Sequence, residues 1–565
     1  MTMLHPLLLL LLLHQLPPTL SAVATDRVTS LPGYSTPLPT KHYSGFVTTP
    51  HPSPKYHTTV QVHHHYWLVE AQAPLDPSTA PTLVWFNGGP GSSSLIGLFT
   101  ENGPFTLNDY STLTNSFNAT NVPTVFDNPY SWNALANVVY VEHPPPTGFS
   151  SCSGYSTFQC PPWDDTTQAA ASLAFFEHFF SADYYPELAT NPLWFSGESY
   201  AGVLVPTLAN LLLQARTPQN THLAPYSIKG FALGNDCPGN QVYTCTPYSG
   251  WMGTQVALDF RFRHGMINES LYTTINQVCQ HEWNTLNGPT SPECRTLLED
   301  PIRPVLSSAG DTYQMGGGYY LYDTCDGDLL DLDNGTHRPR QVHDKEYTVA
   351  HLVRVQRKAQ QRRQQLHSVS PDLADLAEIE VSEPQWMTRA AAQEYYNDAG
   401  AYACGQERAS LVYLNLPSVR AAIHVPSLTH SNRTFSFSTR LPGYNFTAHS
   451  LLDLYNSTLI DQLTIMQYSG EADPCVPYIG TERWIESLKM PVARVWRPWK
   501  SGNEIAGYAT RYQRKKSGPF FDFVTIRNAG HMVPRFQPRA SLDMMRTFLK
   551  EAAAHESLGG EKKKK

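Results

Sequence analysis

The sequence predicts an α/β fold with a mostly parallel central sheet, and three observations lead to this class. Short apolar runs rich in β-branched and aromatic residues recur along the chain and end in turn residues. Segments with helical spacing of apolar residues lie between several of these runs. The chain has 565 residues, of which 41% are hydrophobic and 16% charged, so it is long enough for a large core with insertions.

Two kinds of segment carry these patterns. β-Branched and aromatic residues dominate the expected strands, whereas Ala, Leu and Phe repeat every three or four positions in the expected helices. The strands are expected at 60–70, 82–86, 138–141, 193–195, 463–470 and 521–530, and the helices at 167–180 and 203–215.

The middle of the chain differs from both flanks. From Cys237 to Cys404 the hydrophobic pattern weakens and most of the cysteines occur, which predicts an insertion into the core. The expected organisation is a signal peptide (1–24), the first part of the α/β core (25–236), an inserted, disulfide-bearing helical cap (237–405), the second part of the core (406–550) and a charged tail (551–565).

Two charge runs lie inside the insertion. The stretch 346–367 is basic, rich in Gln and helical in pattern, and the acidic stretch 372–383 follows it. Such neighbours favour solvated faces that pair with each other over a nucleic-acid site. The formal net charge of the chain is −8, whereas nucleic-acid binders are usually basic. The sequence therefore predicts no nucleic-acid partner.

The N-terminus has the pattern of a signal peptide. Leu7 to Leu13 is an unbroken apolar run, and the small residues Ala22-Val23-Ala24 follow, with cleavage expected after Ala24. The run is too short to span a membrane, and no later stretch is apolar enough to form a transmembrane helix. We expect the secretory route, ending outside the cell or in a vacuole or lysosome.

Sequons and cysteines agree with export. Nine cysteines in an exported chain predict disulfides and one leftover thiol. Cys152 lies close in sequence to Cys160, and Cys237 lies close to Cys245. Asn-x-Ser/Thr sequons without proline, the acceptors of N-glycosylation, begin at Asn118, Asn268, Asn334, Asn432, Asn445 and Asn456.

No pattern indicates a metal site or a cofactor. A Cys-x-x-Cys pair, the usual signature of structural zinc, does not occur. His63, His64 and His65 are consecutive in an expected strand, so neighbouring imidazoles point to opposite faces. We therefore expect chemistry that needs neither.

Gly197 to Gly202 has the pattern of a nucleophile elbow. The sequence Gly-Glu-Ser-Tyr-Ala-Gly lies between an expected strand and an expected helix, where a sharp turn exposes the hydroxyl of Ser199. Small residues must flank the serine because the backbone is crowded there, and Gly197 and Ala201 meet this need. The turn also puts Ser199 at a helix N-terminus, where N–H groups favour developing negative charge.

Candidate partners for Ser199 follow in chain order. Asp473 comes after the strand-like 463–470, and His531 comes after the strand-like 521–530. The order Ser, Asp, His, with each residue on a loop after a strand, is that of an α/β-hydrolase fold. In this arrangement His531 takes the serine proton, and Asp473 orients and stabilises the imidazole.

A glycine-rich loop follows the expected strand 82–86. Asn87-Gly88-Gly89-Pro90-Gly91 can turn its N–H groups toward an anion, and no Gly-Lys-Ser/Thr follows that would make it a phosphate loop. We expect the N–H of Gly89 to form an oxyanion hole together with the N–H of Tyr200.

At this point the chain resembles the serine carboxypeptidase family, carboxypeptidase Y-like members of the α/β-hydrolase superfamily. The resemblance covers nearly the whole mature chain. Its blocks are VWFNGGPGSSSLIGLFTENGPF (84–105), NPYSWNALANVVYVEHPPPTGFS (128–150), WFSGESYAG (194–202), YSGEADPCVPYIGTERW (468–484) and NAGHMVP (528–534), with YDTC (322–325) and YLNLPSVRAAIHV (413–425) in support.

The resemblance implies an exopeptidase that reads a free C-terminus. In this family the substrate carboxylate is held by groups that match Trp85, Asn87, Gly88 and Glu198. Glu198 beside a substrate carboxylate would set two like charges together, so one of them must hold a proton. The resemblance therefore predicts serine carboxypeptidase activity on peptides and proteins, best at acidic pH.

The pocket for the leaving residue is partly readable from the same resemblance. In the family the residue after the catalytic histidine helps to line it, which here is Met532. Met532 is apolar and adaptable and favours hydrophobic C-terminal residues. Glu101 falls in a pocket block and would admit some basic ones.

The chain departs from the family pattern at several positions. Ser92 stands where the glycine loop usually carries a Cys, which leaves Cys404 without its usual partner. Glu471 occupies the first acidic position of Gly-Glu-Ala-Asp and is a rival to Asp473 as the third member. Cys475 is the candidate leftover thiol. The segment 327–394 is long and polar, and in relatives this region can be excised to give two chains.

Two other functions remain open at this stage. Some plant relatives are acyltransferases on the same scaffold, but these tend to carry Asp where Glu198 stands. An inactive luminal protein that protects or binds others is the second alternative, against which the intact set Ser199, Asp473 and His531 argues. The sequence leaves the oligomeric state open.

Overall fold

The computed structural model describes most of the chain that follows the predicted signal peptide. The predicted signal peptide up to residue 23, the charge runs at 346–367 and 372–383, Cys404 and the sequons at Asn334 and Asn432 lie outside the described residues. The described residues are 24–53, 58–153, 160–215, 227–242, 250–279, 291–299, 318–322, 406–426, 434–516 and 518–561.

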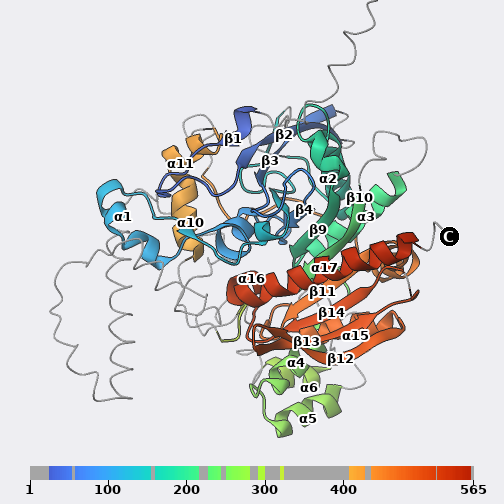
Figure 1. Ribbon diagram of the computed structural model, residues 1–565. Coiled ribbons are helices and arrows are strands. Elements are labelled where there is room, and N and C mark those ends of the chain that lie inside the picture. The colour runs from blue at the N-terminus through green and yellow to red at the C-terminus, as the bar shows by residue number, and fades with distance from the viewer. Residues whose placement is uncertain are drawn as a thin grey trace, which may run out of the picture.

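One large sheet organises the molecule (Figure 1). Its strands include every segment that the sequence predicted as a strand. The described strands are β1 (Arg27–Val28), β2 (His42–Ser53), β3 (Thr58–Val69), β4 (Thr82–Phe86), β5 (Phe105–Thr106), β6 (Phe126–Asp127), β7 (Asn137–Val141), β8 (Ser151–Ser153), β9 (Pro192–Glu198), β10 (Ser227–Gly234), β11 (Thr464–Gly470), β12 (Val492–Ser501), β13 (Glu504–Tyr512) and β14 (Phe521–Ile526).

The described helices connect these strands. The α-helices are α1 (Asn115–Thr120), α2 (Asp165–Phe179), α3 (Ala201–Ala215), α4 (Gly250–Arg263), α5 (Glu269–Cys279), α6 (Pro292–Glu299), α10 (Gln406–Asn415), α11 (Pro417–Ala422), α13 (Leu452–Leu454), α14 (Ile460–Gln462), α15 (Tyr478–Ser487), α16 (Val533–Phe536) and α17 (Pro538–Glu561). Short 3₁₀ or π turns are η1 (Ala24–Asp26), η3 (Gly97–Glu101), η4 (Asp109–Thr112), η5 (Trp132–Ala134), η6 (Pro186–Thr190) and η9 (Tyr455–Leu459).

The sheet is parallel in its middle and antiparallel at both ends. The strand order is β1-β2-β3-β7-β4-β9-β10-β11-β14-β13-β12, with β8 added beside β3 and β5-β6 as a separate pair. Pairing is parallel from β7 through β14 and antiparallel outside that range. The predicted α/β class with a parallel centre is therefore confirmed, whereas the sequence did not indicate four of the longer strands, β2, β10, β12 and β13.

Two hydrophobic cores lie on the two faces of the sheet. Successive side chains of a strand point to opposite faces, and in β4 Leu83 and Trp85 enter one core while Val84 and Phe86 enter the other. Residues of α10 and α17 belong to the first core, and residues of α2, α3 and α15 belong to the second. Because helices cover both faces, the central strands read as continuous apolar runs.

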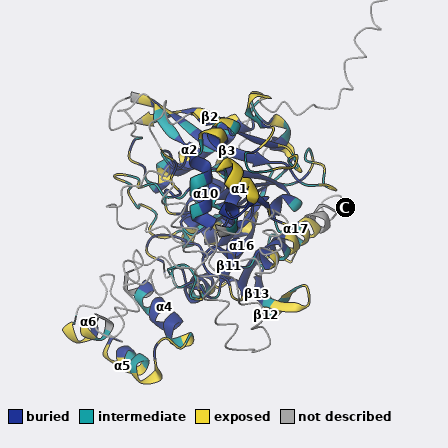
Figure 2. Ribbon diagram, turned by 90° about the vertical axis from the view of Figure 1, so that its left-hand side faces the viewer, coloured by how far each residue is buried: buried dark blue, intermediate teal, exposed yellow. Residues whose placement is uncertain are grey.

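The inserted region contributes a small helical unit of its own. Helices α4, α5 and α6 lie together at one end of the molecule (Figures 1 and 2). Leu258, Ile267 and Ile275 form a separate core there with the Cys279–Cys294 disulfide. The predicted disulfide-bearing helical insertion is thus present in the described part of 237–405.

The cysteines follow the prediction where they are described. Cys152 and Cys160 form a disulfide, and Cys237 is also disulfide-bonded. Cys475 takes part in no disulfide, as predicted for the leftover thiol. Within the described residues, none of the helices has the length and apolar character to cross a bilayer.

Candidate active site

Ser199 occupies a sharp turn between β9 and α3. Its φ of 58° lies in the left-handed region, which a non-glycine residue adopts only at a cost of about 1–3 kcal/mol and which is found mostly at functional sites. The Ser199 N–H donates to the Gly234 carbonyl at 3.0 Å. A Cβ on Gly197 would come within 2.4 Å of the Phe86 carbonyl oxygen and 2.7 Å of the Ala201 Cβ, so only glycine fits there.

Asp473 and His531 are in direct contact. They follow β11 and β14, neighbouring parallel strands whose C-terminal ends lie at the same edge of the sheet as that of β9. Nδ1 of His531 lies 2.7 Å from Oδ2 of Asp473, and both side chains are buried. The Cys475 N–H donates to the other carboxylate oxygen, Oδ1, at 2.8 Å. This contact fixes the proton on Nδ1 and leaves Nε2 of His531 as the basic nitrogen.

Glu471, the rival acid of the same loop, points elsewhere. Its carboxylate accepts a hydrogen bond from the Asn528 N–H at 3.1 Å and is only partly buried. The carboxylate that contacts His531 is that of Asp473, the residue that the chain order predicted as its partner.

Tyr319 was not foreseen from the sequence. It lies in the described piece 318–322 of the inserted region, and its carbonyl oxygen accepts the His531 N–H at 2.6 Å. Its ring stacks on the imidazole with centroids 4.8 Å apart. The next residues extend the contact, because the Leu321 N–H donates to the Ala472 carbonyl at 2.9 Å. This piece therefore bridges the two loops that carry Asp473 and His531.

The glycine loop after β4 lies against the Ser199 elbow. A Cβ on Gly88 would stand 2.5 Å from the Tyr200 nitrogen and 2.7 Å from the Ser199 Cβ, so the two backbones are in contact. Gly89 has a φ of 107°, open only to glycine. The structure thus brings the two predicted oxyanion donors, Gly89 and Tyr200, to neighbouring positions.

Two serine hydroxyls fasten this loop to the end of β7. Ser94 donates to the Val141 carbonyl at 2.6 Å and accepts the Asn87 N–H at 3.3 Å. Ser93 donates to the buried carboxylate of Glu142, whose other oxygen accepts the Phe149 N–H at 2.7 Å. These hydrogen bonds attach the glycine loop to the C-terminal end of β7.

Trp85, Asn87, Glu101 and Glu198 form one buried polar cluster. The Asn87 amide nitrogen donates to Oε1 of Glu198 at 2.8 Å and to Oε1 of Glu101 at 3.0 Å. The Asn87 amide oxygen accepts from the Trp85 indole N–H at 2.8 Å. Glu101, which the sequence suggested as a pocket residue, therefore lies in the cluster predicted to hold the substrate carboxylate.

Burial changes the protonation of both glutamates. Desolvation raises the pKa of Glu101 to about 7, although the bond from Asn87 opposes the shift. Desolvation, reinforced by the charge of Glu101, raises the pKa of Glu198 well above its usual value. The two carboxyl groups share the Asn87 amide nitrogen as a donor and lie close together, so ionising both would set two like charges side by side in the core. The cluster thus carries a carboxylic acid that can donate a hydrogen bond at acidic pH.

Met532 follows His531 and is 5% exposed. It begins the turn of α16 and accepts the N–H groups of Arg535 and Phe536 on its carbonyl oxygen. Arg535 is buried next to it and donates to Glu407 at 2.6 Å. An apolar side chain beside the predicted base is consistent with a pocket for an apolar residue.

The three consecutive histidines of β3 have different partners. His63 lies between Thr48 and Ser153, whereas Nε2 of His64 lies 3.1 Å from Nδ1 of His143. Nε2 of His65 lies 3.0 Å from the Ser44 hydroxyl. The neighbouring imidazoles point apart, as the strand pattern predicted.

Comparison with known proteins agrees with this geometry. A family model described as serine carboxypeptidase matches residues 32–551. The chain is 30% identical over 558 residues to the lysosomal protective protein of Mus musculus, covering 97% of this chain and 98% of that one. It is 29% identical over 532 residues to serine carboxypeptidase-like 20 of Arabidopsis thaliana, covering 94% of both chains.

A solved structure supports the fold. The prohormone-processing carboxypeptidase Kex1Δp of Saccharomyces cerevisiae superposes with a TM-score of 0.58 at 19% identity, covering 91% of this chain and 92% of that one. With the family model matching nearly the whole chain, the chain belongs to the serine carboxypeptidase family.

Proposed function

We propose that this protein is a serine carboxypeptidase that releases single C-terminal amino acids from peptides and proteins at acidic pH. The observation that carries the proposal is the buried pair of Glu101 and Glu198 next to the Ser199 elbow. A site that reads a free C-terminus must offer hydrogen-bond donors to a carboxylate, and a protonated carboxyl group is such a donor. A general serine esterase has no need of it.

Ser199, His531 and Asp473 carry the bond cleavage. The Ser199 Oγ attacks the last peptide carbonyl while Nε2 of His531 takes its proton, and Asp473 stabilises the imidazolium. The N–H groups of Gly89 and Tyr200 bind the oxyanion. When the C–N bond breaks, His531 gives the proton to the leaving amino group, and water then releases the acyl group by the same steps.

The groups around Asn87 hold the substrate carboxylate. The groups of this part of the site are the Asn87 amide, the Gly88 N–H, the acid of Glu198, and Trp85, whose indole N–H orients the Asn87 amide. The contact of Glu101 with Asn87 supports adding Glu101 to them. Met532 lines the pocket of the leaving residue, which favours apolar side chains. The reaction needs no metal or cofactor.

The protein is proposed to enter the secretory pathway, and the name of the murine relative supports a lysosomal or vacuolar destination. Residues 1–24 are proposed as a cleaved signal peptide and 327–394 as an excised linker. The described sequon asparagines Asn118, Asn268, Asn445 and Asn456 are all exposed, as glycan acceptors must be. Sequencing the purified chain and removing its glycans enzymatically test these assignments together.

Mass spectrometry of a peptide-library digest across pH 3 to 8 tests the activity. Stepwise loss of C-terminal residues is expected, fastest at acidic pH, with preference for apolar residues and no cleavage by Ser199→Ala. Internal cleavage, or equal cleavage of C-terminally amidated peptides at acidic pH, would refute it. Transfer from a glucose ester without peptide hydrolysis would instead indicate an acyltransferase, and failure of Ser199 to react with a fluorophosphonate would indicate an inactive binding protein.

A further inference from the structure

Asp165, the first residue of α2, is a buried carboxylate with four strong hydrogen-bond donors. Oδ1 accepts the hydroxyls of Tyr200 and Tyr444, each at 2.7 Å. Oδ2 accepts the N–H groups of Thr447 and Ala448 at 2.6 Å and 2.7 Å. The side chain is 2% exposed. These four hydrogen bonds hold the Asp165 carboxylate in one position, and the N-terminus of α2 favours a negative charge there.

One of these donors belongs to the residue that follows the candidate nucleophile. Tyr200 is 3% exposed, and its ring meets those of Tyr444 and Phe446 edge to face. Its backbone nitrogen is the predicted oxyanion donor and lies against Gly88. The side chain of Tyr200 therefore links Asp165 to a backbone group at the reacting centre.

The other donors lie on residues 435–450, which we name the strap. The strap pairs with the glycine loop, because the Ser93 N–H donates to the Phe437 carbonyl at 2.8 Å and the Thr439 N–H donates to the Gly91 carbonyl at 2.9 Å. A Cβ on Gly91 would come within 2.3 Å of the Thr439 carbonyl oxygen. The strap thus holds the loop that contains Gly89, the second predicted oxyanion donor.

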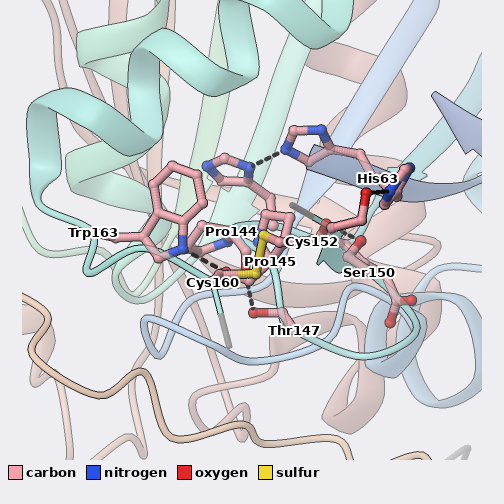
Figure 3. Close-up of a disulfide and its surroundings, with 12 residues drawn as sticks. His63, Pro144, Pro145, Thr147, Ser150, Cys152, Cys160 and Trp163 are labelled. Carbon is pink, nitrogen blue, oxygen red and sulfur yellow. Dashed lines mark hydrogen bonds between the residues drawn. A yellow bond between two sulfur atoms is a disulfide. The ribbon is translucent and has the colours of Figure 1, made fainter. Parts of the chain in front are cut away.

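The N-terminus of α2 is itself rigidly held, so it can act as an anchor. Figure 3 shows the Cys152–Cys160 disulfide beside Trp163, whose indole N–H donates to the Pro145 carbonyl. The Trp163 carbonyl accepts the Asn445 N–H of the strap at 2.9 Å. Asp164 caps the helix by accepting the N–H groups of Thr166 and Thr167. Asp165 therefore projects from a fixed helix end.

We propose that Asp165 is a positioning residue for the oxyanion hole, aligning the Tyr200 N–H directly and the Gly89 N–H through the strap. The inference rests on the proposed function, because it assigns Asp165 a part in that reaction. An N–H group contributes most when it is aimed at the developing oxyanion before the reaction, so loosening Asp165 should weaken transition-state binding more than substrate binding.

The test compares Tyr200→Phe with Tyr272→Phe in the full-length secreted protein. Both changes remove a tyrosine hydroxyl bound to a carboxylate, but Tyr272 donates to Asp259 in the α4–α5 unit. On a blocked dipeptide, Tyr200→Phe should lower kcat about tenfold and leave KM within about twofold. The expected fall in kcat is smaller than the roughly 10² to 10³ lost when a whole oxyanion donor is removed, because the N–H group remains and is only less well aligned. A peptide aldehyde, which forms a tetrahedral adduct, should bind about tenfold more weakly.

Tyr444→Phe and Asp165→Asn extend the series. Tyr444→Phe should lower kcat in the same sense through the strap, and Asp165→Asn should lower it further, while Tyr272→Phe keeps kcat and aldehyde affinity within about twofold. A Tyr200→Phe variant with reduced thermal stability but unchanged kcat and aldehyde affinity would overturn the proposal. A wild-type protein that neither cleaves the dipeptide nor reacts with a fluorophosphonate would overturn the proposed function as well, so the two failures are distinguishable.

Discussion

At the scale of single residues, the buried pair of Glu101 and Glu198 links the candidate site to pH. Two buried carboxyl groups that accept hydrogen bonds from the same amide nitrogen, here that of Asn87, cannot both ionise without strong repulsion. Burial raises both pKa values, that of Glu101 to about 7. Below that pH the pair stays protonated and can donate to a substrate carboxylate; above it the pair gains negative charge and repels one.

We expect Glu198→Gln to flatten the pH profile of peptide hydrolysis. In the wild type, kcat/KM should fall as pH rises through about 7, because the pair then begins to ionise. The Gln amide donates at every pH, so the variant should lose less activity between pH 6 and 8. Initial rates on a blocked dipeptide across pH 4 to 8 measure this.

The matched control for this test is Glu471→Gln. Glu471 is a carboxylate of the Asp473 loop that bonds to the Asn528 N–H rather than to the cluster. This variant should keep the wild-type pH profile. If Glu198→Gln lost activity at neutral pH as steeply as the wild type, the carboxylate-binding role of Glu198 would be wrong.

At the scale of elements, the site is an assembly of backbones that touch without side chains between them. The glycine loop contacts the elbow at Gly88, and the strap contacts the glycine loop at Gly91. Such contacts leave no room for a Cβ, and close packing transmits any displacement directly. Their precision therefore decides where the N–H groups of Gly89 and Tyr200, the predicted oxyanion donors, point.

Gly88→Ala should therefore separate the glycine loop from the elbow. The new methyl would fall 2.5 Å from the Tyr200 nitrogen and 2.8 Å from the Glu198 carbonyl oxygen, which forces one of the two backbones to shift. We expect kcat/KM to fall by roughly 10² to 10³, the loss typical of a misplaced oxyanion donor. Dipeptide kinetics measure the loss, and circular dichroism checks the fold.

The control for this substitution is Gly518→Ala, where the nearest contact of a methyl would be the Lys515 Cβ at 3.2 Å. It should leave kcat/KM within about twofold, since surface substitutions away from special features change stability by about 0.5 kcal/mol or less. A Gly88→Ala enzyme with wild-type kcat/KM would show that the loop and the elbow move independently.

At the scale of the whole molecule, local sequence patterns predicted the features that neighbouring residues along the chain determine. Ser199, Asp473 and His531 could be found because each follows a strand that its own residues specify. The neighbours of Asp165 could not, because Tyr444 and Thr447 come to it from about 280 residues along the chain. Tyr319 is a similar case: only the packing of the insertion brings it to His531.

The antiparallel strands β12 and β13 were missed for another physical reason. β12 is exposed along most of its length and carries Arg and Lys between its apolar residues, so it lacks the apolar continuity of the central strands. β13 shares this mixed composition. Their pairing is decided by β14, which is fully buried and which the sequence did predict.

Two groups of buried residues give the fold opposite responses to acid. Burial lowers the pKa values of His42 and His64 to about 3 in the folded protein. As pH falls below about 6.5, the unfolded chain binds protons at these residues and the folded protein does not, so the free energy of unfolding decreases. The pKa values of Glu101 and Asp236 are raised to about 7 and about 8 in the folded protein. Their buried charges destabilise the fold above those values, and this cost disappears as the folded protein binds protons between there and about pH 4. Between pH 4 and 6.5 the two groups partly cancel.

His64→Gln should therefore make the protein more resistant to acid. His64 is fully buried, stacks on His143 and contacts Phe175 edge to face, so its protonation would place an unpaired charge in the core. At pH 5 His64 is protonated in the unfolded chain, where its pKa is about 6.5, but neutral in the folded protein. This difference lowers the free energy of unfolding by about 2 kcal/mol. Gln cannot gain a proton, and its amide can still bond to His143. Urea unfolding at pH 7 and pH 5 should show a smaller loss of unfolding free energy in the variant than in the wild type. The control is His178→Gln, an exposed position on α2, which should keep the wild-type loss. Equal losses in all three proteins would mean that the buried histidines do not govern acid stability.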